Sequence, residues 1–331
     1  MSSKVDIGQK TVSDFIRVFS CSYAMAGNLA RVMDMAHDDL LSSSVIGFGS
    51  GLATMGDTCG AMNAAIAVLG ARYPDMPFPE FCSLCHSYYS ELERRAGAAD
   101  CGRIHGGKHL AGNFRRAILM GKTRACTKVV RAGAEILVEY SSWKEGSSEH
   151  AGGDEFRERQ IPNGPGVKRI AQYFEQESFH CCASTIRQIA GKLHVPAADL
   201  AGPGRGFCGG IGFNGTMCGA IAGGVLSLGL LARLDLGSAG LRNTIRIVLH
   251  GLLKSEGIFR DEKHFPPARL YAQCREVYQA VEQGYGAPHC REILGLRLDK
   301  EEDQDRFIRE GMLDRCRSIS RTVAETVAGL A

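Results

Sequence analysis

The glycine-rich stretch before Cys59 recurs before Cys218, and this repetition constrains the fold more than any other feature of the sequence. The first copy reads GFGSGLATMGDTCGA from Gly47, and the second reads GFCGGIGFNGTMCGA from Gly206. In both copies the cysteine lies 12 positions after the first glycine. Self-similarity at a fixed spacing is the sequence signature of duplicated structural units. We therefore expect two homologous units in one chain.

Most of the cysteines recur in the same order in the two halves of the chain. Cys21 lies 38 positions before Cys59, and Cys181 lies 37 positions before Cys218. Downstream, two further cysteines are separated by 16 positions in both halves. Ten of the 13 cysteines form the matched pairs Cys21/Cys181, Cys59/Cys218, Cys85/Cys274, Cys101/Cys290 and Cys126/Cys316, which leaves Cys82, Cys182 and Cys208 without a counterpart.

Apolar residues spaced three and four apart predict helices along most of the chain, and no strand-like alternation persists anywhere. The pattern predicts one helix over 11–35 and another over about 110–140. We therefore predict a mostly α-helical fold of two tandem homologous repeats, the second with an inserted helix. The predicted division is a first repeat over 1–140, a polar, glycine-rich linker over 141–166, and a second repeat over 167–331 with the insertion at about 232–264.

The composition is typical of a globular protein and gives no indication that the chain binds a strongly charged partner such as nucleic acid. Hydrophobic residues make up 44% of the chain and charged residues 23%. A net charge of +3 without a basic run argues against nucleic-acid binding. The polar N-terminus has no signal-peptide core, and the apolar run over 219–234 is shorter than the ~20 residues that span a bilayer. We predict a cytoplasmic location without membrane contact, where 13 cysteines favour metal binding or redox chemistry over disulfides.

The glycine-rich stretch predicts a backbone that comes close to a bound group, because glycine has no side chain. In the first copy Asp57 is the expected N-cap of a helix that begins at position 58, which places Cys59 in the first turn. A helix N-terminus lowers the pKa of a thiol, so Cys59 and its counterpart Cys218 are candidate reactive thiols. The glycines expected to approach a cofactor are Gly49, Gly51, Gly56, Gly210 and Gly215.

The matched cysteines follow one pattern twice: Cys21, Cys59-Gly-Ala-Met-Asn-Ala, Cys101 and Cys126, and then Cys181, Cys218-Gly-Ala-Ile-Ala-Gly, Cys290 and Cys316. This pattern resembles the C_GCAxxG_C_C family of redox-active proteins, over most of the chain outside the linker and the insertion. That family is similar to part of the split-Soret cytochrome c, in which the cysteine-bearing fold holds an iron–sulfur centre beside c-type haems. The resemblance implies a redox protein and makes an iron–sulfur cluster the expected cofactor, with these eight cysteines as the expected metal ligands.

Four thiolates can hold either an iron–sulfur cluster or a zinc ion. Zinc sites favour closely spaced cysteines, whereas the matched cysteines here lie 16 or more positions apart, which suits ligands on separate helices. The same spacing suits buried cysteines that never meet, so zinc or no metal stays open. A thiol–disulfide oxidoreductase is a further alternative, with Cys59 or Cys218 attacking and a neighbouring cysteine resolving. Cys85 and Cys274 are additional candidates as ligands, resolving thiols or core residues.

We expect electron exchange with a partner protein, because no general acid–base pair or substrate motif stands out in the sequence. The sequence does not decide between an electron carrier and an enzyme, and it allows a homodimer. Cys82-Ser-Leu-Cys85-His86 matches the attachment motif of covalent haem. The second repeat has Tyr271 at the position of Cys82, and no signal for export is seen, so we interpret this match as chance.

We interpret two residues near the repeated pattern, His105 and Cys208, as structural. His105 follows Cys101 closely, but the aligned stretch after Cys290 has no histidine, so we interpret His105 as a solvent-exposed turn residue. Cys208 stands where the first copy has Gly49. We interpret it as one small residue replacing another, with an additional reactive thiol as the alternative.

Overall fold

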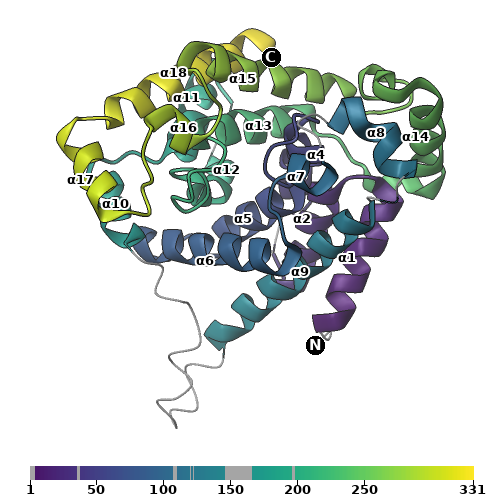
Figure 1. Cartoon of the computed structure of the whole chain (residues 1–331), viewed down its shortest axis with the longest axis horizontal. Coiled ribbons are helices and arrows are strands. Elements are labelled where there is room, and N and C mark those ends of the chain that lie inside the picture. The colour runs from purple at the N-terminus through teal and green to yellow at the C-terminus, as the bar shows by residue number, and fades with distance from the viewer. Residues whose placement is uncertain are drawn as a thin grey trace.

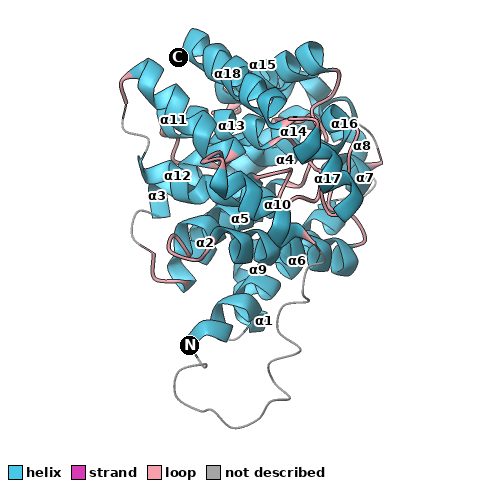
Figure 2. Cartoon of the chain, turned by 90° about the vertical axis from the view of Figure 1, so that its left-hand side faces the viewer, coloured by secondary structure: helices cyan, strands magenta, loops and turns pink. Residues whose placement is uncertain are grey.

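The computed structural model describes residues 4–35, 38–106, 110–119, 121, 123–145, 166–195 and 198–331. Most of the predicted linker, 146–165, lies outside this set, and α9 extends into the linker's first residues. The described residues form helices and no strand, with only two isolated β-bridges (Figures 1 and 2). None of the described helices is both long and apolar enough to cross a membrane. The predicted mostly α-helical class is confirmed.

The first repeat contains α1 Lys4–Val18, α2 Cys21–Val32, α3 Asp38–Ser44, η1 Ile46–Phe48, α4 Gly49–Leu52, α5 Gly60–Arg72, α6 Phe78–Ala96, α7 Cys101–His105, α8 Leu110–Leu119 and α9 Thr123–Glu145. The second repeat contains α10 Val167–Gln176, α11 Cys181–Leu193, α12 Ala198–Gly204, η3 Arg205–Phe207, α13 Gly219–Ala232, η4 Gly237–Ala239, α14 Gly240–Lys254, η5 Ser255–Arg260, α15 Ala268–Tyr285, α16 Cys290–Leu294, α17 Glu301–Arg309 and α18 Leu313–Leu330. Helix α14 lies in the predicted insertion, so the inserted helix is confirmed.

Two long helices predicted from the apolar spacing are each broken in the structure. The segment 11–35 forms the end of α1 and all of α2, with Phe19 between them in the left-handed region at φ 55°. Ser20 caps α2 by accepting a hydrogen bond from the backbone N–H of Tyr23 at 3.3 Å. The segment 110–140 is likewise divided into α8 and α9 near Gly121, which has φ 65°. The prediction of unbroken helices was wrong at both points. The helices on both sides of each break bury apolar residues at helical spacing, so the apolar pattern does not reveal where one helix ends and the next begins.

The largest hydrophobic core contains residues of both repeats, and a second, smaller cluster lies mainly within the second repeat. Residues 60–70 of α5 and 219–229 of α13 are all buried, as expected for helices that are apolar all round. Helix α5 packs against α12 of the other repeat (Figure 1), and α13 packs against α3. On the border between the repeats, the matched residues Phe48 and Phe207 stack with ring centroids 5.5 Å apart. Each repeat therefore supports the centre of the other.

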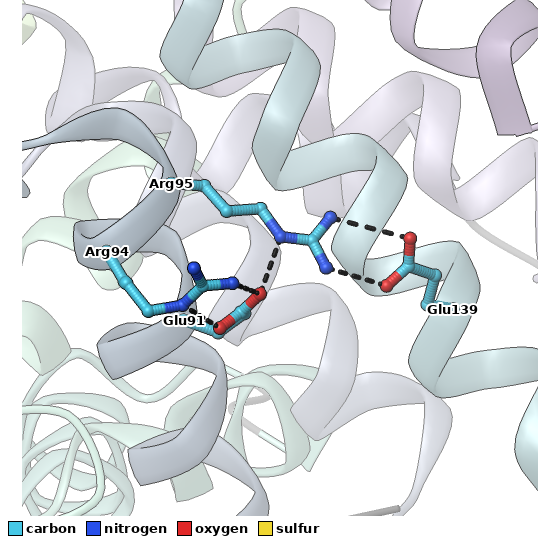
Figure 3. A network of polar contacts seen from close by, with 4 residues as sticks. All are labelled: Glu91, Arg94, Arg95 and Glu139. Carbon is cyan, nitrogen blue, oxygen red and sulfur yellow. Dashed lines mark hydrogen bonds and ion pairs between the residues drawn. The ribbon is translucent and has the colours of Figure 1, made fainter. Parts of the chain in front are cut away.

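Helix α9, which carries Cys126, is tied to α6 by a polar network at the surface (Figure 3). Arg95 lies between two carboxylates, with its guanidinium 2.6 Å from Glu91 and 2.9 Å from Glu139. Arg94 adds a second contact to Glu91 at 2.6 Å. Ion pairs with this degree of exposure contribute at most about 1 kcal/mol each, so the network orients α9 more than it stabilises the fold.

Arg205 connects the second repeat to the loop that follows α5 in the first. Its guanidinium donates hydrogen bonds to the carbonyls of Tyr73 at 2.8 Å and Met76 at 2.6 Å, and also to the carbonyl of Pro74. The same group lies 5.1 Å from the ring centroid of Phe81, a favourable cation–π arrangement. The arginine next to the second glycine-rich stretch therefore joins the two repeats.

Replacing Arg205 by alanine is expected to lower the free energy of unfolding by about 2 to 3 kcal/mol. Hydrogen bonds from a charged donor are among the stronger ones, and their carbonyl acceptors would lose their partner. Denaturant unfolding of the variant measures the change. Arg187→Ala serves as a control, because Arg187 is exposed on α11 and should cost less than about 0.5 kcal/mol. Equal costs for the two variants would show that the guanidinium contacts contribute nothing.

Candidate thiol sites

The four matched cysteines of the first repeat all lie at the N-terminal ends of helices. Cys21 and Cys101 are the first residues of α2 and α7, and Cys59 is the N-cap residue of α5. Cys126 is in the first turn of α9. The second repeat reproduces this arrangement with Cys181 on α11, Cys218 before α13, Cys290 on α16 and Cys316 on α18.

The four thiols of the first repeat line one cavity of about 60 Å³. Its walls are mainly apolar and include Phe15, Phe19, Ile118 and Val130. The volume is several times the roughly 15 Å³ that a single water needs, so the cavity has room for a small group of atoms. The predicted convergence of Cys21, Cys59, Cys101 and Cys126 thus has a physical basis in this repeat: four helix N-termini surround one small space.

A left-handed turn brings the glycine-rich stretch to the first cysteine of each repeat. All residues of 50–54 and of 209–213 have positive φ. Several of them are not glycine, and each of those costs roughly 1–2 kcal/mol in this conformation. Because of this turn, the backbone N–H of Ser50 donates a hydrogen bond to the Cys21 sulfur, and the backbone N–H of Gly209 donates one to the Cys181 sulfur. Such strained backbone tends to be retained at functional sites.

The predicted cofactor-binding glycines mostly serve close packing around the cysteines. Gly49 lines the cavity. Gly51 has φ 69°, and a Cβ on it would collide with Cys101 and lie 2.6 Å from the Asp57 carbonyl oxygen. The matched Gly210 meets the backbone of Thr216 in the same way. Gly56 and Gly215 have φ 80° and 73°, and their carbonyls accept hydrogen bonds from the N–H groups of Gly102 and Arg291. Direct contact of these glycines with a cofactor stays a prediction.

A steric constraint explains why the residue after the cysteine in each Cys-Gly-Ala motif is glycine. A Cβ on Gly60 would lie 2.6 Å from the Phe48 carbonyl oxygen and 3.0 Å from the Cys21 sulfur. A Cβ on Gly219 would collide with the Phe207 carbonyl and lie 2.8 Å from the Cβ of Cys181. Glycine therefore lets the second cysteine's helix approach the first cysteine. Sequence reasoning missed this role, although the glycine is present in both copies.

Two backbone hydrogen bonds fix the second and third cysteines of each repeat side by side. In the first repeat the N–H of Cys59 donates to Ala99 at 2.8 Å, and the N–H of Cys101 donates to Asp57 at 2.9 Å. In the second repeat the N–H groups of Cys218 and Cys290 donate to the carbonyls of Pro288 at 2.9 Å and Thr216 at 2.8 Å.

The thiol with the lowest pKa in each site is not the one that the sequence predicts: it is Cys21 or Cys181, and not Cys59 or Cys218. Helix α5 begins at Gly60 with Cys59 as its N-cap, so the predicted start at position 58 with Asp57 as N-cap was wrong. A hydrogen bond from Cys59 lowers the pKa of the Cys21 thiol to about 7, and the same contact, with burial, raises the pKa of Cys59.

In the second repeat, hydrogen bonds from Cys208 and Cys316 hold the pKa of Cys181 well below its ordinary value. Burial and the nearby Cys181 raise the pKa of Cys218 to about 12. The expectation that a helix N-terminus gives Cys59 and Cys218 lowered pKa values is therefore wrong. Neighbouring sulfurs and burial outweigh the helix ends, and the first cysteine of each repeat is the more acidic thiol.

His105 belongs to the first site. It is only 6% exposed, and its Nε2 lies 3.0 Å from the Cys126 sulfur, so its interpretation as an exposed turn residue was wrong. Helix α7 is short, and the residue at its end turns inward beside the cysteines. The matched position in the second repeat is Leu294, which cannot form a hydrogen bond with Cys316. The two sites therefore differ in polarity.

The two sites also differ at a pair of positions that pack across the repeat boundary. Tyr271 of the second repeat lines the first cavity, and its hydroxyl occupies the space that a Cβ on Gly49 would need. At the matched positions of the second site stand Cys82 and Cys208, both fully buried. The N–H of Cys181 donates to the Cys208 sulfur at 3.3 Å. Cys208 therefore does more than replace a glycine, because it adds a fifth sulfur to the second site.

Cys85 and Cys274 lie against the glycine-rich stretch of the opposite repeat. A Cβ on Gly206 would lie 2.9 Å from the Cys85 sulfur, and one on Gly47 would lie 2.7 Å from the Cys274 sulfur. Both thiols are fully buried, and neither lines the cavity of the first repeat. Their observed contacts are those of core residues, and a role as ligands stays a prediction.

The residues of the haem-attachment motif also face the other repeat. Cys82 and Cys85 are completely buried in α6, and His86 Nδ1 lies 3.0 Å from the carbonyl oxygen of Gly212. This packing gives the motif a role in joining the repeats and leaves its interpretation as a chance match unchanged.

The arrangement of the thiols bears on the kind of metal that they could hold. All 13 cysteines are free thiols. Among the described residues, no group of three or more His, Cys, Asp or Glu side chains is arranged as a ready metal site. The four thiols of the first site thus line one cavity without being preset, in the part of the chain that the structure describes, as a metal site.

An ion pair between a buried aspartate and a partly exposed histidine connects the two repeats close to both sites. Asp57, two residues before Cys59, lies 3.1 Å from His289, the residue before Cys290. Burial alone would raise the pKa of Asp57, but pairing with His289 holds it below its ordinary value. Burial alone would lower the pKa of His289, but pairing with Asp57 and, at 3.1 Å, with Glu292 raises it to about 9.

This ion pair predicts a pH-dependent stability. Its contribution is complete below about pH 6.5, the ordinary pKa of histidine, and is lost as the pH rises through about 9. On the acid side it is present above about pH 3.8 and lost as the pH falls further. We expect His289→Gln to lower the free energy of unfolding by about 3 kcal/mol near pH 6 and by much less near pH 10. Denaturant unfolding across this range tests the prediction, and a cost that does not change with pH would contradict it.

Fold and site together define a tandem-repeat, all-helical protein with a buried cluster of thiols in each repeat. The protein-family model described as "Putative redox-active protein (C_GCAxxG_C_C)" matches residues 19–140 and 179–330. The chain belongs to this family and contains its pattern twice. No curated protein and no solved structure matches the chain.

Proposed function

We propose that each repeat holds an iron–sulfur cluster through its four matched cysteines and that the protein exchanges electrons with a partner protein. The observation that supports this proposal is the convergence of four thiols, at four helix N-termini, on one apolar cavity. Four thiolates are the usual ligand set of such clusters. A cavity several times larger than one water favours a cluster of atoms over a single zinc ion.

The chain's own groups suit a negatively charged centre. Burial raises the pKa values of Cys101 and Cys290, so without metal these thiols stay protonated at neutral pH, whereas a bound metal ion deprotonates its thiol ligands. Helix N-termini stabilise the resulting negative charge. The backbone N–H groups of Ser50 and Ala61 point at the Cys21 sulfur. A bound cluster would supply a one-electron carrier, and hydrogen bonds to its sulfur ligands tune the potential.

The difference between His105 and Leu294 predicts two different potentials. A proton on Nε2 makes His105 a hydrogen-bond donor to the Cys126 sulfur, which favours the more negative, reduced state. We expect His105→Leu to lower the potential of the first site by roughly 40 mV, the equivalent of a hydrogen bond of about 1 kcal/mol. Potentiometric titration followed by electron paramagnetic resonance measures the shift. Leu294→Met provides the control and should leave both potentials in place; an unchanged potential in His105→Leu would contradict the assignment.

A thiol–disulfide oxidoreductase is the second candidate, favoured by the hydrogen bond between the Cys21 and Cys59 thiols. In this reaction the Cys21 thiolate attacks one sulfur of a disulfide substrate and displaces the other as a thiolate. Cys59, after losing its proton, attacks Cys21 in the mixed disulfide and releases the second substrate thiol. The substrate disulfide gains two electrons, and the Cys21–Cys59 pair becomes a disulfide.

A redox titration of protein purified without oxygen distinguishes the two candidates. The cluster proposal expects visible absorption that bleaches reversibly in one-electron steps. The dithiol candidate expects colourless protein that loses two free thiols per turnover and gains an intramolecular disulfide, detected by mass spectrometry after alkylation. Colourless protein without thiol turnover would contradict both.

A further inference from the structure

Helix α14, which the insertion adds to the second repeat, has two apolar faces. One face packs on the chain: Ile247 is 2% exposed, and the Thr244 hydroxyl donates to the Arg17 carbonyl of α1 at 2.8 Å. The other face is open. It carries an apolar stripe of four residues at i, i+4 spacing, Leu241, Ile245, Leu249 and Leu253, which are 53%, 50%, 55% and 81% exposed. A contiguous exposed apolar stripe of this kind marks an interaction site more often than a random surface.

Helix α14 lies against the elements that line the first thiol cavity. Helix α14 contacts α1 and α8, and it runs beside α8 at the right-hand edge of Figure 1. Ala117 and Ile118 of α8 line the thiol cavity, and the next residue, Leu119, is 68% exposed. Phe15 and Phe19, at the end of α1 and just after it, line the same cavity. The insertion of the second repeat therefore packs beside the walls of the first site and leaves its apolar stripe exposed.

The border of the stripe is positively charged. Arg242 and Arg246 of α14 and Arg115 of α8 are exposed, and neither α8 nor α14 contains an aspartate or glutamate. An apolar centre with a charged border of one sign suits a partner that presents an apolar patch with acidic residues around it. A second copy of this chain would bring arginines against arginines, which disfavours self-association through this face.

We propose that the α14 stripe and its arginine border form the docking surface for an acidic electron-transfer protein at the first thiol site. The proposal rests on the proposed function and names the surface through which it acts: the partner exchanges one electron with the first repeat's site, beside which it docks. The first repeat has no counterpart of the insertion, and among the described residues no equivalent helix lies beside the second site.

The test uses an acidic [2Fe–2S] ferredoxin as the probe and measures its binding by isothermal titration calorimetry and its rate of electron donation by stopped-flow absorption. At low salt we expect binding that weakens at least tenfold when the salt is raised from 50 to 500 mM, because the attraction is screened. Leu249→Glu and Arg246→Glu should each weaken binding about tenfold and slow reduction by the ferredoxin equally. Reduction by dithionite, which needs no docking surface, should be unchanged.

Val32→Glu is the matched control. Val32 is 42% exposed and lies at the C-terminal end of α2, far along the helix from Cys21, so its replacement should leave ferredoxin binding intact. The proposal is overturned if Leu249→Glu binds like the unchanged protein, or if the ferredoxin does not bind. It is also overturned if Leu249→Glu instead abolishes binding to phosphatidylcholine vesicles with 30% phosphatidylserine or dissociates a dimer. Binding is measured with and without metal, so a missing cluster with intact binding would contradict only the proposed function.

Discussion

Replacing Cys59 by serine is expected to remove about half of the iron and half of the visible absorption of the protein. Cys59 is one of four thiols around the first cavity, and a serine hydroxyl is a poor substitute for a thiolate ligand of iron. Serine is nearly the same size, and Cys59 lies at the end of a helix, so the fold should persist. The second repeat supplies its own set of thiols, and its cluster should remain.

Cys218→Ser should remove the other half, and the double variant should contain almost no iron. Cys85→Ala is the control within the first repeat, because Cys85 is a matched cysteine whose contacts are to the opposite repeat. Iron and acid-labile sulfide analysis on anaerobically purified variants gives the result. Full iron content in Cys59→Ser would show that the first repeat does not use this thiol.

The second large effect is expected at Gly51. Gly51→Ala should lower the free energy of unfolding by more than about 4 kcal/mol, because the added Cβ would meet Cys101 and the Asp57 backbone in a conformation that already disfavours alanine. Gly97 provides a matched comparison. It has φ 83°, but a Cβ there meets nothing within 4 Å, so Gly97→Ala should cost only about 1–2 kcal/mol.

Denaturant unfolding of both glycine variants measures the difference between them. Iron content adds a second readout, since Gly51→Ala should also disturb the first site through Cys101, whereas Gly97→Ala should not. Similar unfolding free energies for the two variants would mean that the close approach of the glycine-rich turn to α7 does not matter for the fold.

The duplication explains why so much of the fold could be predicted from one sequence. The two copies of the unit can be compared with each other within the chain. This comparison separates the residues that recur in the stretches beginning at Gly47 and at Gly206 from the residues that differ. The same comparison identified the insertion that became α14. The comparison also identified the matched cysteines, which the structure places at helix N-termini. That these cysteines bind a metal is still a prediction.

Features that break the symmetry, or that lie across the repeat boundary, could not be predicted in this way. His105 is present in one copy only, and its burial depends on how α7 turns toward Cys126. Tyr271 enters the first site from the second repeat, which no local pattern reveals. The pairing of Asp57 with His289 joins positions that are not matched between the copies. The break at Phe19 is hidden because apolar spacing continues through it.

The most direct test of the account is the iron, zinc and acid-labile sulfide content of protein purified without oxygen, together with its visible spectrum. The account predicts equal iron and sulfide, at least about four iron atoms per chain for two clusters, and broad absorption near ~400 nm that bleaches with dithionite. Colourless, metal-free protein with rapidly reacting thiols would contradict cluster-based electron transfer and favour dithiol chemistry. Zinc alone would contradict both and leave a structural metal-binding protein.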